Sequence, residues 1–287
     1  ALAAVIGQEP RLTPTTYAEA MECDARSGQP SWTNAIEEER ENMADNSAWE
    51  EAKAPPGLTT IPCMWVFKEK LGRDGEIARF RARVVAKGYL QRLGINYNDT
   101  FAPTLRMDSL RLMLVYCLSN KWDLQQYDVK GAFQIPELPP EEMVYMKPPP
   151  GVKVKPGYVL RLLKCIYGLK QSGRRWNQHF NATVTKMGFK VVDGEDCLYI
   201  LMVNGRLLSL LAVYVDDILV GAISKEEGQR IAQSLRDAYT ITELGVPKWL
   251  LGAEIDYNPT AGTLRISQKS YALQVLERFN HAQVNPS

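Results

Sequence analysis

The sequence predicts an α+β fold in which one sheet carries its helices on one face. The middle of the chain shows strand and helix patterns in the order βαββαβ, with long helices between the strands. Residues 207–223 form two apolar, β-branched runs around Asp216 and Asp217, as a strand, a tight acidic turn and a return strand would. Asn204-Gly205, just before them, is a strong signal for a type I′ hairpin.

The aspartate pair allows two interpretations. Aspartate is common in turns because its side chain hydrogen-bonds its own backbone. Two carboxylates held on a rigid sheet are also suitable ligands for a divalent cation. Residues 207–223 alone do not decide between a plain turn and a metal site.

The charges are distributed unevenly. The chain has 287 residues, 45% hydrophobic and 23% charged, with a net charge of +1, as in ordinary globular proteins. Residues 1–54 carry eleven acids and four bases, residues 68–92 eight bases and three acids, and residues 153–186 eight bases and no acid. Two basic zones favour a polyanionic partner, and solvated faces that happen to sort by charge are the alternative.

The cysteines indicate an intracellular protein. The five cysteines are far apart and there are two histidines, so neither a zinc site nor a disulfide framework is expected. Reduced thiols are typical of the cell interior. No apolar run reaches the roughly 18 residues that a membrane span needs, and we expect no membrane partner. The chain lacks an initial Met and ends in VNPS, which indicates a piece of a longer polypeptide.

The N-terminal part predicts a helical flank and then a hairpin. Helices are expected over residues 16–23 and 31–46, the second capped by Ser31 or Thr33. Pro55-Pro56-Gly57 marks a linker. Residues 61–71 and 77–89 predict two strands joined by a turn at residues 72–75.

The second of these strands carries a row of arginines. Alternation puts Arg79, Arg81 and Arg83 on one face and apolar residues on the other. Guanidinium groups match phosphate oxygens, so this face suits a phosphate-bearing ligand. A solvated edge strand is the alternative.

The remaining elements follow in order. A helix over residues 107–120 leads into a strand over 122–130 that contains Asp128, and a Pro-rich loop follows. A basic loop at 166–175 enters a helix over 172–187, which is a plausible anion site. Further patterns predict a helix over 224–239, a hairpin over 249–267 and a helix over 268–279. Asp128 and the pair at 216–217 could meet as the carboxylates of a two-metal phosphoryl-transfer site.

Six segments, in this order, give the chain a specific resemblance. It resembles the reverse transcriptase domain of copia-type LTR retrotransposons and, more distantly, retroviral reverse transcriptases. The segments are WVFKEKLGRDGEIARFRARVVAKGYLQRLGINYNDTFAPT (65–104), QQYDVKGAF (125–133), VYMKPPPG (144–151), LRLLKCIYGLKQSGRRWN (160–177), YVDDILV (214–220) and ELGVPKWLLGAEI (243–255). One departure is AFQIPEL, where the family usually has an Asn-Gly after the first aspartate.

The resemblance implies a right-hand polymerase fold. Its parts would be an N-terminal helical flank at 1–57, fingers at 58–127, a palm at 128–267 with a fingers insertion at about 134–170, and the start of a thumb at 268–287. The activity would be RNA- and DNA-directed DNA synthesis by two-metal transfer of dNMP to a primer 3′-OH. Asp128, Asp216 and Asp217 would be catalytic and, with the Val129 carbonyl, would hold two Mg²⁺, for which Mn²⁺ can substitute.

The resemblance also implies the substrate contacts. The incoming dNTP would meet Arg79, Arg81, Arg83, Lys87, Phe133 and Gln171. Phe133 would block a ribose 2′-OH, unless it is a core residue. Template and primer would meet Lys170, Arg174, Tyr214, Leu251 and Gly252, whereas we expect Trp249 to lie in the core.

The implied partners are an RNA template, a DNA primer–template duplex, dNTP, a tRNA primer and other Pol and Gag domains of the element. The implied location is a cytoplasmic virus-like particle, with the DNA copy going to the nucleus. The alternative is a degenerate or domesticated module that binds nucleic acid without polymerising, and AFQIPEL and the short thumb favour it.

Overall fold

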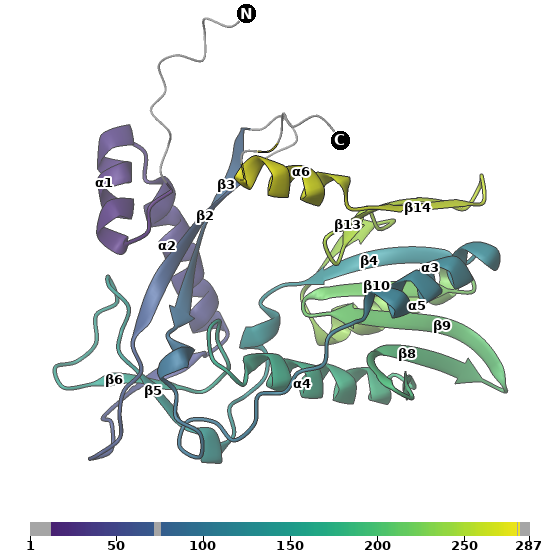
Figure 1. Cartoon of the computed structure of the whole chain (residues 1–287). Coiled ribbons are helices and arrows are strands. Elements are labelled where there is room, and N and C mark those ends of the chain that lie inside the picture. Colours follow the sequence, from purple (N-terminus) through teal and green to yellow (C-terminus); the bar gives the residue numbers. More distant parts are fainter. Residues whose placement is uncertain (1–12, 72–75, 280, 282–287) are drawn as a thin grey trace, which may run out of the picture. The chain divides into compact units, whose positions relative to one another are not determined.

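The computed structural model describes residues 13–71, 76–279 and 281. They divide into two compact units (Figure 1). Unit 1 comprises residues 1–101 and 133–175, and unit 2 comprises residues 102–132 and 176–287. The predicted division into flank, fingers, palm and thumb stays a prediction.

The described part of unit 1 contains helices α1 and α2, a long hairpin and a small sheet. The hairpin pairs β2 with β3 antiparallel, from Cys63 opposite Ala86 to Lys70 opposite Arg79. Its predicted turn at residues 72–75 lies outside the described residues. The small sheet has the order β1-β6-β5. The bounds are α1 Tyr17–Ser27, α2 Ser31–Asp45, β1 Trp49–Ala52, β2 Cys63–Leu71, β3 Ile77–Ala86, β5 Val144–Met146 and β6 Val159–Leu162, with 3₁₀ turns at Gly88–Leu90 and Pro140–Glu142.

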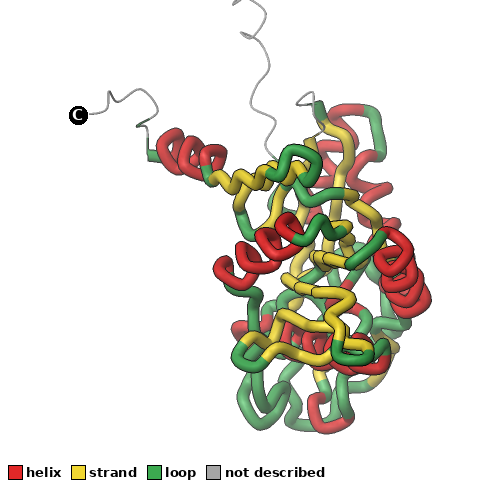
Figure 2. The backbone as a smooth tube through the Cα atoms, turned by 90° about the vertical axis from the view of Figure 1, so that its right-hand side faces the viewer, coloured by secondary structure: helices red, strands yellow, loops and turns green. Residues whose placement is uncertain are grey.

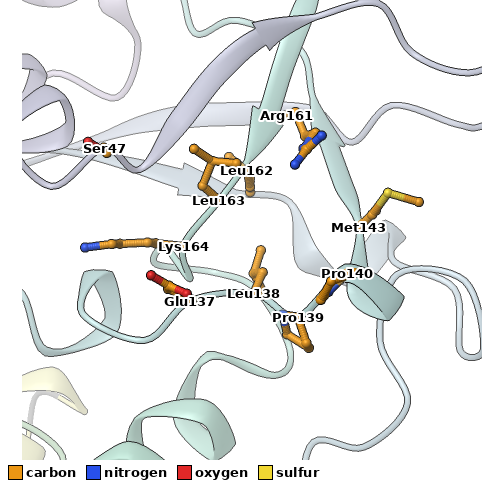
Figure 3. A pocket seen from close by; sticks show the side chains of 10 residues that line it. All are labelled: Ser47, Glu137, Leu138, Pro139, Pro140, Met143, Arg161, Leu162, Leu163 and Lys164. Atoms are coloured by element: carbon orange, nitrogen blue, oxygen red, sulfur yellow. The ribbon is translucent and has the colours of Figure 1, made fainter.

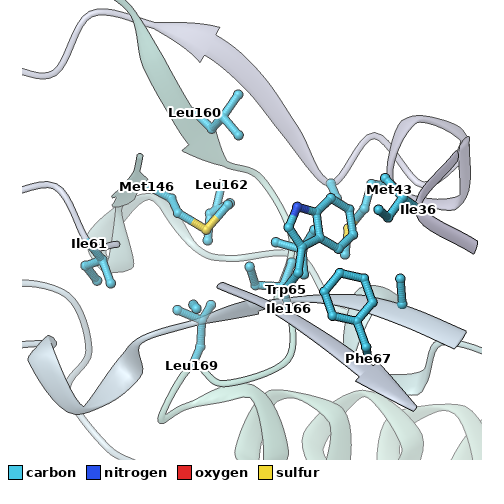
Figure 4. Packing of buried hydrophobic residues seen from close by; sticks show 14 of the residues in the cluster. Ile36, Met43, Ile61, Trp65, Phe67, Met146, Leu160, Leu162, Ile166 and Leu169 are labelled. Atoms are coloured by element: carbon cyan, nitrogen blue, oxygen red, sulfur yellow. The ribbon is translucent and has the colours of Figure 1, made fainter. Parts of the chain in front are cut away.

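The core of unit 1 joins α2, the hairpin and the small sheet (Figure 4). The Trp32 ring meets Phe67 and Phe80 edge-on, at centroid distances of 5.3 and 4.7 Å. Aromatic pairs of this kind add to the free energy gained by burying their area. Other buried members are Ile36, Met43, Ile61, Trp65, Ala82, Val84, Met146, Leu160, Leu162, Ile166 and Leu169.

The start of α2 is capped from α1. The predicted caps, Ser31 and Thr33, are wrong: Pro30 is the N-cap residue and makes no side-chain cap bond. The Asp24 carboxylate accepts hydrogen bonds from the backbone N–H groups of Trp32 and Thr33, at 2.9 and 2.8 Å. A tight turn between the helices brings this carboxylate back to the free N–H groups of the first turn, a contact that local sequence patterns do not reveal.

Helix α2 also covers the free edge of β3. The buried carboxylate of Glu39 accepts a hydrogen bond from the Val84 N–H at 3.2 Å, and the Ala86 N–H donates to the Tyr167 carbonyl at 2.8 Å. These bonds satisfy edge groups that would otherwise pair with another chain. Burial raises the pKa of Glu39 to about 7, against the opposing effects of the Val84 hydrogen bond and the charges of Arg83 and Arg81.

Unit 2 is built on a six-stranded antiparallel sheet of order β11-β4-β10-β9-β8-β7, beside a three-stranded sheet of order β12-β13-β14. Helix α6 has no buried residue and extends from the end of β14 (Figure 2). The bounds are α3 Met107–Ser119, β4 Asp123–Val129, α4 Ser172–Lys186, β7 Lys190–Val192, β8 Glu195–Val203, β9 Arg206–Tyr214, β10 Asp217–Ala222, α5 Lys225–Ala238, β11 Ile241–Gly245, β12 Trp249–Leu250, β13 Ala253–Asn258, β14 Thr263–Ser267 and α6 Lys269–Arg278, and a 3₁₀ turn lies at Ala132–Gln134.

The large sheet carries helices on both faces, so the expectation of one covered face is wrong. A Cβ on Gly221 would lie 2.4 Å from the Cys117 sulfur of α3. Gly228 of α5 instead lies against Ala222, the next residue along β10. Successive strand residues point to opposite faces, so α3 and α5 cover opposite sides.

None of the helices in the described ranges combines the length and apolar character that crossing a bilayer requires.

We expect Glu39 to make unit 1 less stable as pH rises. Its pKa is about 7 in the fold, against an ordinary value of 4.5 for glutamate. The folded state therefore binds more protons between these values, and stability falls from about pH 4.5 to pH 7 and then levels off. The free energy of unfolding lost over this pH range is on the order of 3 kcal/mol. Urea denaturation at pH 5 and pH 8 should show this loss in the wild type and a smaller one in Glu39→Gln.

The control is Glu38→Gln, which changes an exposed neighbour and should behave like the wild type. If Glu39→Gln loses as much stability as the wild type, Glu39 is not the source of the pH dependence.

We expect Gly221→Ala to destabilise unit 2 because the new methyl group would collide with Cys117. Overpacking of this kind costs about 1–3 kcal/mol. Cys117→Ala removes the colliding sulfur, so the double variant should be more stable than the sum of the single effects predicts. Urea denaturation of the three variants measures this coupling. Strict additivity would show that α3 does not pack on Gly221.

Candidate nucleic-acid polymerase site

The two adjacent aspartates occupy different positions in the β9–β10 hairpin. β9 ends at Tyr214 and β10 begins at Asp217, and these two residues pair across the hairpin. The turn is therefore Val215-Asp216, and Asp217 is already the first residue of a buried strand. Val215 has φ +56°, a strained conformation for a β-branched residue.

Two hydrogen bonds hold this strained turn. The Trp176 indole N–H donates to the Val215 carbonyl at 2.6 Å, and the Val129 N–H donates to the Asp216 carbonyl at 2.8 Å. Trp176 is buried, so its ring is fixed by packing. The turn that carries Asp216 is thus attached to both α4 and β4.

The third predicted carboxylate lies directly across from the hairpin. In the β4–β10 pair, Asp128 is the register partner of Asp217. Paired residues of an antiparallel sheet point to the same face, at Cβ separations of about 5 Å. Sequence reasoning brought Asp128, Asp216 and Asp217 together, and the sheet does place all three at one end of β10.

Like charges placed opposite each other repel. Burial raises the pKa of Asp217, a hydrogen bond from Gln126 lowers it, and the charges of Asp216 and Asp128 raise it again, with a net increase. All three aspartates are half-buried. A divalent cation would relieve this repulsion.

The donor chemistry fits Mg²⁺, whose preferred ligands are carboxylate and carbonyl oxygens. The arrangement is nevertheless not a closed cage: within the described ranges, no group of three or more His, Cys, Asp or Glu side chains is close enough to hold a metal ion. Val129 is buried next to Asp128, and its carbonyl stays a predicted ligand. The metal assignment as a whole stays a prediction.

Gln126 is a site residue that sequence reasoning missed. It lies two residues before Asp128 on the same face of β4, and its side chain is buried. Its Nε2 donates to Asp217 Oδ1 at 2.8 Å. The available signal was a glutamine at a position where strand alternation would put an apolar residue.

The predicted primer-binding hairpin lies next to this face. Leu251 and Gly252 connect β12 to β13 with φ values of +51° and +71°, as in a type I′ turn. The prediction that Trp249 lies in the core is wrong, because 46% of it is exposed. Alternation along β12 puts Leu250 inward and therefore turns Trp249 outward.

The arginine face of β3 is confirmed by burial. Ala82 and Val84 are in the core of unit 1, so the arginines occupy the other face. Arg79 forms an ion pair with Glu38, and the Arg83 guanidinium lies 4.1 Å above the Tyr167 ring centroid. Burial and then the charge of Arg83 lower the pKa of Arg81.

Tyr167 links Arg83 to Phe133, another contact that sequence reasoning missed. The rings of Phe133 and Tyr167 meet edge-on at 5.4 Å. Phe133 is half-buried, so its surroundings do not choose between the gate and the core interpretations. The next residue, Gly168, lets the backbone of this loop approach β3 closely. Gly168 has φ +90°, and a Cβ there would lie 2.1 Å from the Ala86 carbonyl oxygen.

The basic loop after Gly168 is internally bonded. Gln171 is fully buried; its Nε2 donates to the Asn96 carbonyl at 2.8 Å and its Oε1 accepts from Gln91 at 2.9 Å. This gives Gln171 a structural role, and its predicted nucleotide contact stays a prediction. Exposed Lys170 lies 4.8 Å above the Tyr97 ring centroid.

The two remaining residues of unit 1 that were predicted to contact a ligand are Arg174 and Lys87. Arg174 forms an ion pair with Asp99 at 3.1 Å, and Lys87 is half-buried at the end of β3. Their predicted ligand contacts stay predictions.

The AFQIPEL loop, which departs from the usual family sequence, is held in unit 1 by hydrogen bonds. Gln134 is buried and accepts a hydrogen bond from Asn42 at 2.7 Å, and the Cys165 N–H donates to the Pro136 carbonyl at 3.0 Å. The loop borders a hollow of about 470 Å³ that contains none of the predicted site residues (Figure 3). Its lining includes Leu138, Pro139, Arg161 and Lys164.

Comparison with known proteins agrees with the resemblance. Residues 46–287 match the family model described as reverse transcriptase (RNA-dependent DNA polymerase). The chain is 34% identical over 276 residues to the retrovirus-related Pol polyprotein from transposon RE2 of Arabidopsis thaliana, which covers 95% of this chain and 18% of the relative. It is 33% identical to the corresponding polyproteins of transposon RE1 of the same plant and of TNT 1-94 of Nicotiana tabacum, over 89% and 88% of this chain and 17% and 19% of theirs.

The chain thus spans less than a fifth of the length of each of these relatives. The family model nevertheless covers most of the chain. The chain therefore belongs to the reverse transcriptase (RNA-dependent DNA polymerase) family, in the branch found in the Pol polyproteins of copia-type transposons.

Proposed function

We propose that this chain is the polymerase module of a copia-type Pol polyprotein and that it copies RNA, and DNA, into DNA. The observation that carries the proposal is the pairing of Asp128 opposite Asp217, with Asp216 in the adjoining turn. Carboxylates from separate strands of one rigid sheet are what two-metal phosphoryl transfer needs.

The proposed reaction is the attack of a primer 3′-OH on the α-phosphate of a dNTP, with release of pyrophosphate. When bound, Mg²⁺ or Mn²⁺ would activate the hydroxyl and neutralise charge on the leaving group. Asp128, Asp216, Asp217 and the Val129 carbonyl would hold the ions. The protein forms no covalent intermediate, so its contribution is positioning and electrostatic stabilisation.

In unit 1, the arginine face of β3 is proposed to hold the triphosphate. Arg81 and Arg83 are the preferred contacts, with Arg79 and Lys87 beside them. The ion pair between Arg79 and Glu38 supports the preference for Arg81 and Arg83, because a phosphate that bound Arg79 would have to displace the Glu38 carboxylate. Lys170 and Arg174 are proposed to contact the template, and Gln171 the nascent base pair.

In unit 2, Tyr214 and the Leu251-Gly252 turn are proposed to contact the primer. The right-hand division into fingers, palm and thumb belongs to the same proposal. The proposed partners are an RNA template, a DNA primer–template, dNTP, a tRNA primer and other Pol and Gag domains. The proposed location is a cytoplasmic virus-like particle.

A second candidate is a module that binds nucleic acid without polymerising. Two observations favour it: the AFQIPEL departure and the lack, within the described ranges, of a three-ligand metal cluster. Primer extension on poly(rA)/oligo(dT), with and without Mg²⁺, distinguishes the two functions. A folded protein that binds the duplex but incorporates no dTMP would select this second candidate.

We expect Asp216→Asn to abolish Mg²⁺-dependent primer extension while RNA–DNA binding survives, because a neutral amide is a poor ligand for Mg²⁺. Gel-shift and extension assays measure the two properties. Asp196→Asn is a matched control, since Asp196 is an exposed aspartate on β8 of the same sheet. Undiminished extension by Asp216→Asn would remove the metal assignment.

We expect Phe133→Ala to admit ribonucleotides, because the side chain proposed to exclude the 2′-OH would be gone. Discrimination should fall at least tenfold in the ratio of kcat/KM for dTTP to that for UTP. Phe101→Ala, which truncates an exposed phenylalanine of the same unit, is the control. If discrimination stays the same in the folded variant, Phe133 acts only in packing.

A further inference from the structure

The buried side chain of Gln126 joins two segments of unit 2. Its Nε2 donates to Asp217 Oδ1 at 2.8 Å and to the Trp249 carbonyl oxygen at 3.3 Å. Asp217 starts β10, and Trp249 starts the β12–β13 hairpin. One amide group therefore bridges a predicted catalytic carboxylate and the hairpin of the Leu251-Gly252 turn.

The position of Gln126 in the sheet explains this reach. Its register partner on β10 is Leu219, so Asp217 is the diagonal neighbour on the same face. Diagonal neighbours are within reach of a long side chain. On the other side, the pairing of β11 with β4 is irregular between Glu243 and Gly245, and Gly245 is the partner of Gln126. Bulges of this kind are frequent beside active sites because they redirect the strand.

The chemistry of the two acceptors determines how the Gln126 amide is oriented. A carboxylate and a backbone carbonyl can only accept hydrogen bonds, so both N–H groups of the amide are used and its nitrogen must face them. The bond to the carboxylate is charge-assisted and is the stronger of the two. A buried donor that loses its acceptor is costly, so neither segment can move without cost while the other stays.

The β12 strand of this hairpin is short, and it is held by the buried side chain of Leu250 and by the pairing of β13 with β14. β12 consists of two residues, Trp249–Leu250, and pairs only with β13 among the described strands. Trp249 itself is exposed and so is not fixed by core packing.

We propose that Gln126 is a positioning residue that couples cation binding at the carboxylates to the placement of the β12–β13 hairpin. A cation that fixes Asp217 would fix the amide, and through it the Trp249 carbonyl and the Leu251-Gly252 turn. This inference rests on the proposed function, because it takes the carboxylates as the cation site and the hairpin as the primer contact.

The test uses Gln126→Met, which keeps the length of the side chain and removes both donors. Gln126→Asn keeps the amide but shortens it by one methylene group, so it cannot reach both acceptors. Gln125→Met is the matched control: Gln125 is the preceding residue, points to the other face of β4 and donates instead to Asp123 at 3.1 Å.

Hydrogen exchange of residues 249–254, measured by mass spectrometry with and without Mn²⁺, is the main readout. In the wild type and in Gln125→Met, Mn²⁺ should slow exchange in this hairpin severalfold. In both Gln126 variants, exchange should be faster without the ion and insensitive to it. Mn²⁺ affinity, measured by electron paramagnetic resonance, should fall severalfold in the same two variants.

The wild-type measurement keeps the test decisive even where a variant does not fold. If Mn²⁺ binds the wild type and leaves hairpin exchange unchanged, the inference is overturned. It is overturned equally if both folded Gln126 variants match the control. If the wild type binds no Mn²⁺ and extends no primer, the proposed function fails and the coupling fails with it; bound Mn²⁺ with unchanged hairpin exchange overturns the coupling alone.

Discussion

The antiparallel pairing of β4 with β10 is the constraint on which the candidate site depends. Its register places Asp128 opposite Asp217, and a shift of one residue would send one of them to the other face of the sheet. Both faces are covered, by α3 and α5, so the register is fixed by packing on two sides. The close contact at Gly221 belongs to the same constraint, since a larger residue there would push α3 off the sheet.

The site is held under electrostatic and conformational strain. Two carboxylates face each other across the strands, and Val215 adopts a left-handed conformation in the turn beside them. Hydrogen bonds from Trp176, Val129 and Gln126 oppose this strain. Strained backbone and like charges are typical of sites where a ligand supplies part of the stabilisation.

Unit 1 uses acidic and aromatic groups to order its arginine strand. Glu38 and Glu39 of α2 lie beside β3, and Tyr167 supports the guanidinium of Arg83. Helix α2, which composition alone describes as part of an acidic flank, is therefore an integral part of this unit. The ion pair of Glu38 with Arg79 would compete with the proposed phosphate contact of that arginine.

The sequence by itself determined most of the strands and helices of unit 2, the alternation of β3 and the family, because these follow from local periodicity and from ordered motifs. It did not determine the edge strands β7 and β11, which are short. It did not determine the Asp24 cap, the helices on both faces, the exposure of Trp249 or the roles of Gln126 and Tyr167. Each of these depends on a contact between segments distant in the chain. Only tertiary structure decides such contacts, since the same side chain satisfies local rules equally well with or without its distant partner.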